Sequence, residues 1–399
     1  MSTFKICDWR LALGAAATAL LVACGGGGSS DPVTSPVVAT AATSYSQGAI
    51  TGFGSVFVGG LRYDDSAAAV SDDDGAMHSS SALKLGMMVQ VDGSHVNPAA
   101  ATATALRIRF GNEVLGPVGA VDSAASTVQV LGQTVLVTTS TVFDSSLSGG
   151  LSALSAGMVV QVHGLLDSAN GRIVATRIES ASAATIYRLR GVMSALDTSA
   201  KTFRIGNELI SYAGIDSAAL PTSLADGKLV RVTLQTTPMG GAWVAVQLRS
   251  GARLPDTPRP DAHVEGAITA FTSSADFVVN GLTVNASNAT FPDGTTGIVL
   301  GARVEVHGTV TDGVLVATKV EMQDRRDHGR RELELRGDLG TLDSSAKTFA
   351  LRGVTVWYGG TVVYKGGTEA DLANGKRVEV KGVLSVDRTR FEARAISFK

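Results

Sequence analysis

LGARVEVHG, residues 300–308, is the stretch of sequence that decides the fold, because the chain repeats it. Related stretches recur at intervals of about 70 to 74 residues: LGMMVQVDG (85–93), AGMVVQVHG (156–164), DGKLVRVTL (226–234) and NGKRVEVKG (374–382). Each begins at a glycine and continues with alternating apolar and polar residues, which is the period of a β-strand. Five copies at an even interval indicate a tandem repeat.

Two further signatures accompany each copy of this strand. A segment such as RGVMSALDTSAKTFRIGNELI (190–210) precedes it, and a segment such as LVATKVEM (315–322) follows it. The preceding segment holds three strand candidates, of which the last two meet at a tight turn such as Asn280-Gly281, a strong hairpin signal. A connection long enough for one helical turn then leads to the repeated strand, and one more strand closes the unit.

Three strands, a connection and two strands in about 70 residues is the order of the OB-fold, a five-stranded barrel. The sequence therefore predicts an all-β chain of five tandem OB-like five-stranded β-barrel repeats. An SH3-like barrel or a small sandwich is the alternative at this point. The composition agrees with many short strands, since 44% of the residues are hydrophobic, 46 are glycine and 5% are aromatic.

The first residues have the features of a secretion signal. LALGAAATALLVA (11–23) follows a basic start and is shorter than a membrane span needs to be. GGGGSSDPVTSP (25–36) comes next; it is rich in Gly, Ser and Pro and has no apolar period, as a flexible tether does. We therefore expect a signal peptide over residues 1–23 and a tether over residues 24–46.

The junction of these two segments, LVAC (21–24), resembles the lipobox of bacterial lipoproteins. The resemblance implies cleavage before Cys24, lipid chains on its sulfur and new amino group, and, because Gly25 follows, the outer membrane. With its tandem units, the chain resembles a family of bacterial lipoprotein domains of uncharacterised function and OB-like shape. The likeness covers residues 47–399 and implies no catalytic residues. Cys7 leaves with the signal, so no thiol remains for a disulfide or a zinc site.

The repeats and the composition between them divide the chain after the tether. We expect these units: repeat 1 over 47–110, repeat 2 over 111–181, repeat 3 over 182–251, a Pro-rich linker over 252–261, repeat 4 over 262–323, a charged linker over 324–331, and repeat 5 over 332–399. A barrel of this size without a disulfide has a marginal core. We therefore expect neighbouring repeats to pack against one another.

His307 is the residue of the repeated strand that could bind a metal ion or exchange a proton. Val304 and Val306 alternate with Glu305 and His307, which predicts valines in the core and the polar pair in solvent. The position of His307 is filled in the other repeats by Asp92, His163, Thr233 and Lys381. A solvated face tolerates such exchange, whereas a metal site common to all repeats would not. A site in a single repeat stays open.

Two charged runs supply the remaining candidate residues. Asp72, Asp73 and Asp74 lie in SDDDG (71–75), which lacks the spaced acidic pattern and the distal Glu of a calcium loop, so we interpret it as a solvated loop with a subordinate metal-binding alternative. In DRRDHGRR (324–331), the candidates for phosphate or acidic-sugar binding are Arg325, Arg326, Arg330 and Arg331. A mixed-sign linker is the simpler interpretation of that run.

The sequence predicts a binding protein of the bacterial cell envelope rather than an enzyme. A net charge of −2 and few aromatic residues argue against nucleic acid as a partner, and we find no nucleophile elbow or phosphate-binding loop. We expect no cofactor beyond the lipid on Cys24, a membrane contact through that lipid, and an envelope protein or glycan as partner. A structural spacer and a metal-assisted envelope hydrolase are the alternatives. Whether the protein faces the periplasm or the surface stays open.

Overall fold

Each of the five repeats has the strand order of the OB-fold. Repeat 3 shows it in full: β14 (Tyr187–Asp197), β15 (Thr202–Ile205), β16 (Glu208–Ser211), β17 (Leu229–Leu234) and β18 (Trp243–Ser250). The first three strands form an antiparallel meander, β18 runs parallel to β16, and β17 joins β18 to β14. This circuit closes a five-stranded barrel, so the prediction of five tandem OB-like barrels is confirmed, and the SH3-like and sandwich alternatives are wrong.

The other repeats follow the same plan, seen here in a computed structural model that describes residues 42–53, 55–253, 255, 257–323, 333–385 and 390–399. Repeat 1 contains β1 (Ser44–Ala49), β2 (Val56–Val58), β3 (Leu61–Asp64), an added hairpin of β4 (Ala69–Asp72) and β5 (Met77–His78), β6 (Met88–Gly93) and β7 (Thr102–Phe110). Repeat 2 contains β8 (Val114–Asp122), β9 (Thr127–Val130), β10 (Gln133–Leu136), β11 (Val142–Phe143), β12 (Val159–Asp167) and β13 (Arg172–Ser180).

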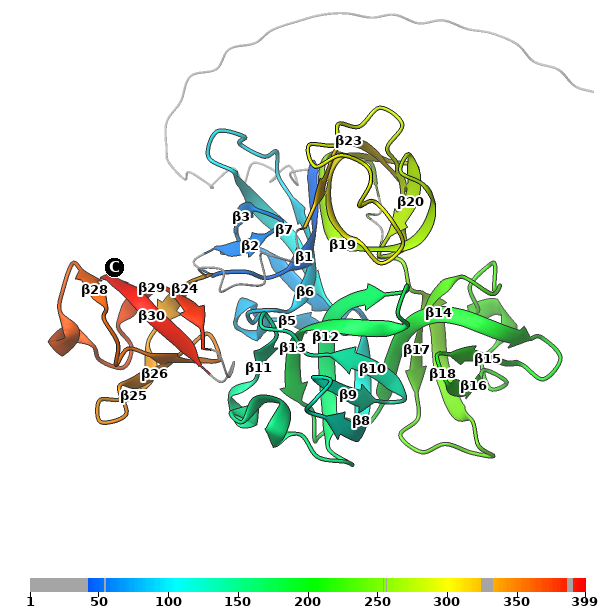
Figure 1. The fold of residues 1–399 in the computed structure, drawn as a ribbon, viewed down its shortest axis with the longest axis horizontal. Coiled ribbons are helices and arrows are strands. Elements are labelled where there is room, and N and C mark those ends of the chain that lie inside the picture. Colours follow the sequence, from blue (N-terminus) through cyan, green and yellow to red (C-terminus); the bar gives the residue numbers. More distant parts are fainter. Residues whose placement is uncertain (1–41, 54, 254, 256, 324–332, 386–389) are drawn as a thin grey trace, which may run out of the picture. The chain divides into compact units, whose positions relative to one another are not determined.

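Repeats 4 and 5 complete the series. Repeat 4 contains β19 (Arg259–Ser273), β20 (Asp276–Val279), β21 (Leu282–Asn285), β22 (Arg303–Thr311) and β23 (Val314–Met322). Figure 1 shows this repeat nearly end-on, so that its strands trace a ring. Repeat 5 contains β24 (Leu333–Asp338), β25 (Gly340–Asp343), β26 (Thr348–Leu351), β27 (Val354–Trp357), β28 (Val363–Lys365), β29 (Arg377–Leu384) and β30 (Phe391–Phe398).

Short 3₁₀ turns occupy the connection before the fourth barrel strand, where the sequence predicts room for one helical turn. They are η1 (Ser80–Ala82), η2 (Ser145–Leu147), η3 (Gly150–Ala153), η4 (Ser217–Ala219) and η6 (Glu369–Asp371). Asp144 caps η2 and Asp216 caps η4 by accepting a hydrogen bond from a backbone N–H two residues later. The described residues contain no helix long and apolar enough to cross a membrane.

The glycine that opens each repeated strand has a conformation that other residues adopt only at a cost. Its φ is positive in all five repeats, from +81° to +87°, at Gly86, Gly157, Gly227, Gly301 and Gly375. The tight turn at Asn280-Gly281 also has positive φ at both residues, 51° and 88°, as the predicted hairpin requires. The repeated glycines are therefore explained by the backbone conformation that these positions require.

The glycine that ends VEVHG serves a different purpose. The register of β22 against β23 shifts between His307 and Gly308, which marks a β-bulge. A Cβ on Gly308 would lie 2.1 Å from the carbonyl oxygen of Val316, so a side chain does not fit there. The same bulge occurs at Gly93, Gly164 and Gly382. Because a bulge bends a strand, it lets the long fourth strand curve around the barrel.

Repeats share sheets in two pairs, of which repeats 2 and 3 are neighbours in the sequence, as predicted, and repeats 1 and 4 are not. β1 of repeat 1 runs parallel to β19 of repeat 4, which makes one sheet of both repeats. β8 of repeat 2 pairs with β14 of repeat 3 and joins those two in the same way. Met88, Leu165 and Ala267, from repeats 1, 2 and 4, form a small apolar cluster in which each residue is 2% exposed. Residues 41–399 accordingly form one compact unit.

Two strands begin before the predicted start of their repeat. β1 begins at Ser44, within the predicted tether, and β19 begins at Arg259, within the predicted Pro-rich linker. Both extensions pair within their own barrels, Ser44 with Gly93 and Arg259 with Val310, and Ser44 also pairs with Asp261 of the other strand. The predicted signal peptide, Cys24 and the charged linker lie outside the described residues.

Candidate functional site

The first, fourth and fifth strands of each barrel are neighbours, so their outward side chains form one continuous surface, which we call the polar face. In repeat 2, for example, His163 of β12 lies opposite Arg177 of β13, and Gln161 lies opposite Glu179. In repeat 4, His307 of β22 lies between His263 of β19 and Lys319 of β23. The apolar residues between them, such as Val304 and Val306, are fully buried inside the barrel, as predicted.

The polar face is not solvated in the way the sequence suggested. The side chains at the position of His307 are exposed by 13% (Asp92), 1% (His163), 8% (Thr233), 21% (His307) and 49% (Lys381). The solvent-facing interpretation is therefore wrong for His163 and incomplete for His307. Strand alternation correctly places these residues outside the barrel, but other repeats cover the polar faces of repeats 1 to 4.

Buried ion pairs connect these repeats at one junction. Glu113, directly before β8, is 1% exposed and accepts hydrogen bonds from Arg190 at 2.7 Å and from Arg253 at 2.9 Å. Arg190 also donates to the carbonyl oxygens of Gly251, at 2.6 Å, and Asn280, at 2.8 Å. One arginine of repeat 3 thus contacts the start of repeat 2, the segment after β18 and repeat 4.

The acidic run of repeat 1 belongs to the same junction. The Asp73 carboxylate lies 2.8 Å from the guanidinium of Arg253 and 3.4 Å from that of Arg231, and Asp74 pairs with both Arg188 and Arg231. The interpretation of this run as a solvated loop is therefore wrong for Asp73, whose side chain is 8% exposed. The hairpin of β4 and β5 extends from repeat 1 to repeat 3, a placement that local sequence does not encode.

Asp72 stabilises the turn of the hairpin and does not pair with any arginine that the structure describes. Its carboxylate accepts backbone hydrogen bonds from Asp74 and Ala76, both at 2.9 Å, and lies 3.3 Å from Nε2 of His78. Asp72 thus shapes the turn, while the next two residues pair with arginines. The three candidate metal ligands of the sequence therefore face three different sets of partners.

The junction shifts the acidity of the carboxylates that it buries. Burial alone would raise the pKa of Asp73, but the charges of Arg253 and Arg231 outweigh burial and lower it. Burial likewise opposes ionisation of Glu179, yet Arg177, His163 and Lys84 lower its pKa to about 2. Both carboxylates are therefore ionised at neutral pH and attract their cationic partners fully.

A cavity of about 330 Å³ opens at the junction of repeats 1, 2 and 3. Its wall includes Asp74, Phe110, Asn112, Gln161, His163 and Arg188. Charges of both signs, two amides and an aromatic ring therefore face one space. The volume lies at the lower end of the range for small-molecule sites.

His163 contributes an unused acceptor to this cavity. Its Nδ1 lies 2.9 Å from the carbonyl oxygen of Gly111, and because a carbonyl can only accept, Nδ1 carries the proton. Its Nε2 is buried and has no hydrogen-bond partner in the described part of the chain. Burial, with a further contribution from the charge of Arg177, outweighs the Glu179 carboxylate and lowers the pKa of His163 to about 4. The ring is therefore neutral at pH 7, with Nε2 as its hydrogen-bond acceptor.

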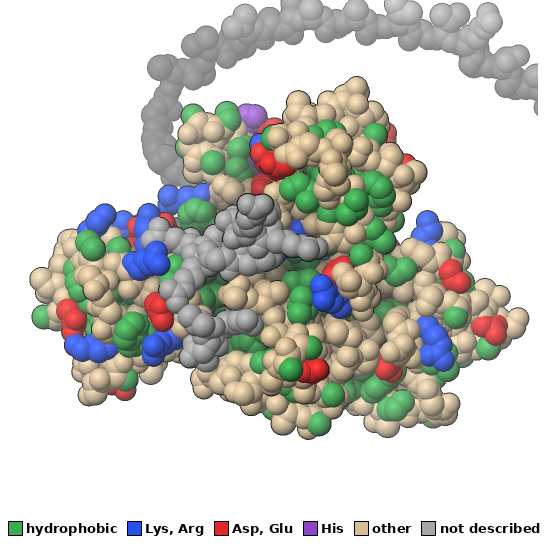
Figure 2. All heavy atoms as spheres, in the orientation of Figure 1, with side chains coloured by type: hydrophobic (Ala, Val, Ile, Leu, Met, Phe, Trp, Pro, Cys, Tyr) green, Lys and Arg blue, Asp and Glu red, His purple; other side chains and the backbone are tan. Residues whose placement is uncertain are grey.

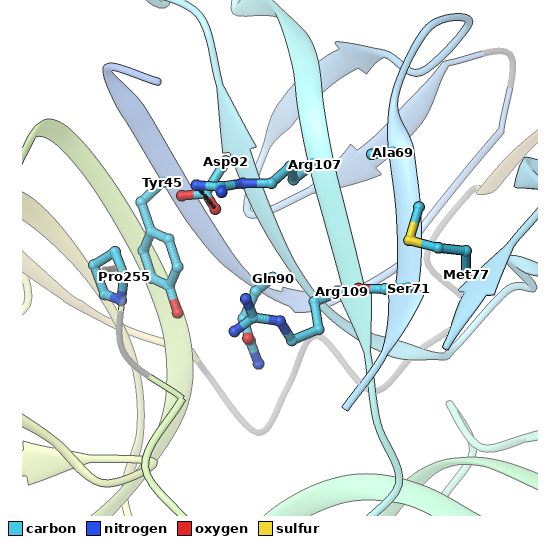
Figure 3. Close-up of a pocket in the computed structure, with 9 residues that line it drawn as sticks. All are labelled: Tyr45, Ala69, Ser71, Met77, Gln90, Asp92, Arg107, Arg109 and Pro255. Atoms are coloured by element: carbon cyan, nitrogen blue, oxygen red, sulfur yellow. Dashed lines mark ion pairs between the residues drawn. The ribbon is translucent and has the colours of Figure 1, made fainter. Parts of the chain in front are cut away.

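A second, smaller pocket lies on the polar face of repeat 1. Figure 3 shows Tyr45 from β1, Gln90 and Asp92 from β6, and Arg107 from β7 around it, with an ion pair of 3.3 Å between Arg107 and Asp92. Its volume is about 90 Å³. This space suits a few water molecules rather than a sugar or a peptide, so the larger cavity is the better candidate site.

The molecular surface itself offers no comparable concentration of charge on the face that Figure 2 draws, where acidic and basic side chains are scattered among neutral ones. Arg325, Arg326, Arg330 and Arg331, the candidate anion-binding residues of the sequence, lie outside the described residues. Sequence reasoning missed Glu113, Arg190 and Arg253, and it placed His163 on a solvated face. The sequence did contain a signal for Arg190 and Glu113. Both are charged residues within or directly beside strands whose apolar pattern predicts burial.

The fold and the site together define a class: a tandem OB-like β-barrel protein whose polar faces meet at a charged junction. Residues 116–179, 265–321 and 340–397, which fall in repeats 2, 4 and 5, match the family model described as "Domain of unknown function (DUF5666)". No curated protein matches the sequence. A solved structure described as "drosophila Unr CSD456" is 13% identical over 54% of this chain and 98% of that chain, with a TM-score of 0.15. A superposition with that score carries no argument, and the OB-like assignment rests on the strand pairing above.

Proposed function

We propose that the protein is a non-catalytic binding and scaffold module of the bacterial cell envelope, anchored by lipid at Cys24, and that the junction cavity is its ligand site. The observation that carries this proposal is the unpartnered Nε2 of His163 in a mixed-sign cavity. A buried polar atom without a partner is costly, and a bound ligand would remove that cost.

The chemistry of the cavity favours a polyhydroxylated ligand such as an envelope glycan. A sugar hydroxyl can donate to His163 Nε2 or to a carboxylate, and it can accept from an amide or a guanidinium. The cavity presents both kinds of group, for example His163 and Asp74 as acceptors and Asn112 and Arg188 as donors. A simple anion or cation fits this cavity less well, because residues of the same charge as the ion would repel it.

Glycan binding by the purified protein tests this proposal. We expect saturable binding to a member of an array of envelope oligosaccharides and at least tenfold weaker binding by Gln161→Ala, which removes a lining amide. Gln247→Ala is the matched control, because Gln247 lies on β18 and does not line the cavity. Failure of every glycan to bind, or equal binding by both variants, would contradict the assignment of the site.

A structural spacer is the second candidate function, favoured by the shared sheets, which join repeat 1 to repeat 4 and repeat 2 to repeat 3, and by the buried ion pairs. Contacts of this kind between repeats fix the distance that the folded chain spans. If the protein is a spacer, cells that carry a version without repeat 5 should keep partial function at reduced length, and Gln161→Ala should behave as wild type in cells.

The anchor has its own test. Cys24→Ser should remove incorporation of labelled palmitate and move the protein from the membrane fraction to the soluble fraction, because a lipid chain contributes about 0.8 kcal/mol of membrane affinity per buried methylene. Cys7→Ser is the control and should leave both unchanged. Palmitate labelling that persists in Cys24→Ser would refute lipidation at this residue.

A further inference from the structure

The polar face of repeat 4 brings two histidines and a glutamate together, apart from the junction cavity. His263 of β19 is the direct cross-strand partner of His307 of β22, and their rings meet edge to face with centroids 4.4 Å apart. Glu305 lies two residues before His307 on the same side of β22, and its Oε1 is 3.4 Å from Nε2 of His307. One ligand atom from each residue lies within 4.8 Å of the others.

The distance between Glu305 and His307 matches that between two ligands of a small metal ion. Two ligands that each lie about 2.1 Å from a tetrahedral ion are separated by about 3.4 Å. The other two pairs of ligand atoms lie within 4.8 Å and would approach each other by at most about 1.4 Å to reach this separation. Strands β19 and β22 supply it from paired positions, which is a more rigid setting than a loop.

The ring nitrogens of this group lack other partners. Nδ1 of His263 and Nε2 of His307 are both buried, and neither has a hydrogen-bond partner among the described residues. Glu305 is held from behind, because its Oε2 accepts a hydrogen bond of 2.9 Å from Gln323. Oε1 is thereby left to face His307. The group thus offers an imidazole nitrogen from each histidine and one oriented carboxylate oxygen, all within 4.8 Å of one another.

We propose that His263, Glu305 and His307 bind a first-row divalent transition metal ion of the zinc type. Imidazole nitrogens with a carboxylate suit zinc, nickel or copper, whereas calcium and magnesium prefer sets made of oxygen. At the equivalent of His307 the other repeats have Asp92, His163, Thr233 and Lys381, so the site belongs to repeat 4 alone.

A fourth possible ligand, the carboxylate of Glu321, lies beside the site. Oε2 of Glu321 on β23 is 3.5 Å from Nε2 of His307 and 2.9 Å from the ammonium of Lys319. Lys319 therefore opposes metal binding in two ways, since it holds Glu321 and adds positive charge. Its removal frees Glu321 to act as a fourth ligand.

Calorimetric titration of the tag-free, chelator-treated full chain with Zn²⁺ alone tests the site. We expect one ion per chain for the wild type, at least tenfold weaker binding by His307→Gln and His263→Gln, and unchanged binding by His95→Gln, whose side chain is 78% exposed. Lys319→Ala should bind several-fold more tightly. Mg²⁺ in millimolar excess should not compete.

The Lys319→Ala variant keeps the test decisive if a histidine variant fails to fold, because it removes no ligand and its side chain is 38% exposed. Co²⁺ offers a second readout, since a tetrahedral site with nitrogen ligands gives visible absorption bands that His307→Gln should lose. The proposal is overturned if the wild type shows no saturable Zn²⁺ binding, or if folded His307→Gln binds as the wild type does.

Discussion

Glu113 is the residue on which the packing of the repeats depends most directly. It is 1% exposed and neutralises Arg190 and Arg253, which belong to repeat 3 and to the segment that follows it. Glu113→Gln keeps the shape but leaves two buried guanidinium groups without this carboxylate. We expect a loss of about 3 to 5 kcal/mol in the free energy of unfolding, measured by urea denaturation.

The surface pair of Lys347 and Glu369 provides the control for this prediction. Their side chains are 44% and 46% exposed, so water screens the attraction between them. Glu369→Gln should leave the denaturation midpoint nearly unchanged. A similar small effect for Glu113→Gln would show that the junction adds little to stability.

His163 makes stability depend on pH. Its pKa is about 4 in the folded chain and 6.5 when unperturbed, so between these values the unfolded chain binds a proton that the folded chain does not. The free energy of unfolding therefore falls as the pH decreases from neutral towards 4, by about 2 kcal/mol between pH 7 and pH 5. At higher pH both states are deprotonated and this contribution vanishes.

Urea denaturation at pH 7 and pH 5 measures this contribution. His163→Gln should lose about 2 kcal/mol less stability than the wild type over that interval, because glutamine does not titrate. Glu179 does not interfere, since its pKa of about 2 confines its effect to more acidic solution. The idea fails if wild type and variant lose stability in parallel.

At the scale of the element, two glycines shape the repeated strand for different reasons, and repeat 2 separates them. Gly157 has φ +87° with open space around it, so Gly157→Ala should cost about 1 to 2 kcal/mol of backbone strain. A Cβ on Gly164 would lie 2.5 Å from the carbonyl oxygen of Val174, and backbone atoms cannot swing aside. We expect Gly164→Ala to be the more destabilising change.

Gly214→Ala is the matched control for both substitutions. Gly214 has open space around it and no positive φ, so alanine should be tolerated or slightly stabilising. Thermal melting of the three variants gives the order directly. Equal losses for Gly164→Ala and Gly214→Ala would contradict the role assigned to the bulge.

At the scale of the whole molecule, repeats 1 to 4 should unfold together. Shared sheets and the Glu113 junction join them, so loss of one repeat exposes surface on another. A chain that ends at residue 251 loses the β1–β19 pairing and the contact of Arg190 with Asn280. We expect its melting temperature to fall further than that of a chain ending at residue 323.

Calorimetry distinguishes cooperative unfolding of repeats 1 to 4 from independent unfolding of each barrel. Repeat 5 shares an apolar cluster with repeat 1 and accepts a backbone hydrogen bond of 2.9 Å from Phe53 at Glu334, but none of its described residues takes part in the Glu113 junction. Its removal should therefore disturb repeats 2, 3 and 4 less than repeat 1. Separate transitions for repeats 1, 2, 3 and 4 in the full chain would contradict cooperative unfolding.

The candidate site illustrates how far sequence reasoning reaches. Strand alternation correctly assigned Val304 and Val306 to the core and His307 to the outside of the barrel. It could not tell that the outside of repeats 1 to 4 is covered, because period two distinguishes only the two faces of a strand. Asp73 was misread for the same reason: its arginine partners are more than 150 residues away in the chain.

The sequence by itself determined the repeat, the strand order and the barrel, because glycine turns, bulges and apolar alternation act over a few residues and recur in every copy. The tertiary structure decided which polar faces are buried and which charges pair. It placed Glu113 against Arg190 and His263 against His307. The physical reason is range: backbone geometry is encoded locally, whereas burial of a charge depends on surfaces that meet only after the barrels have formed.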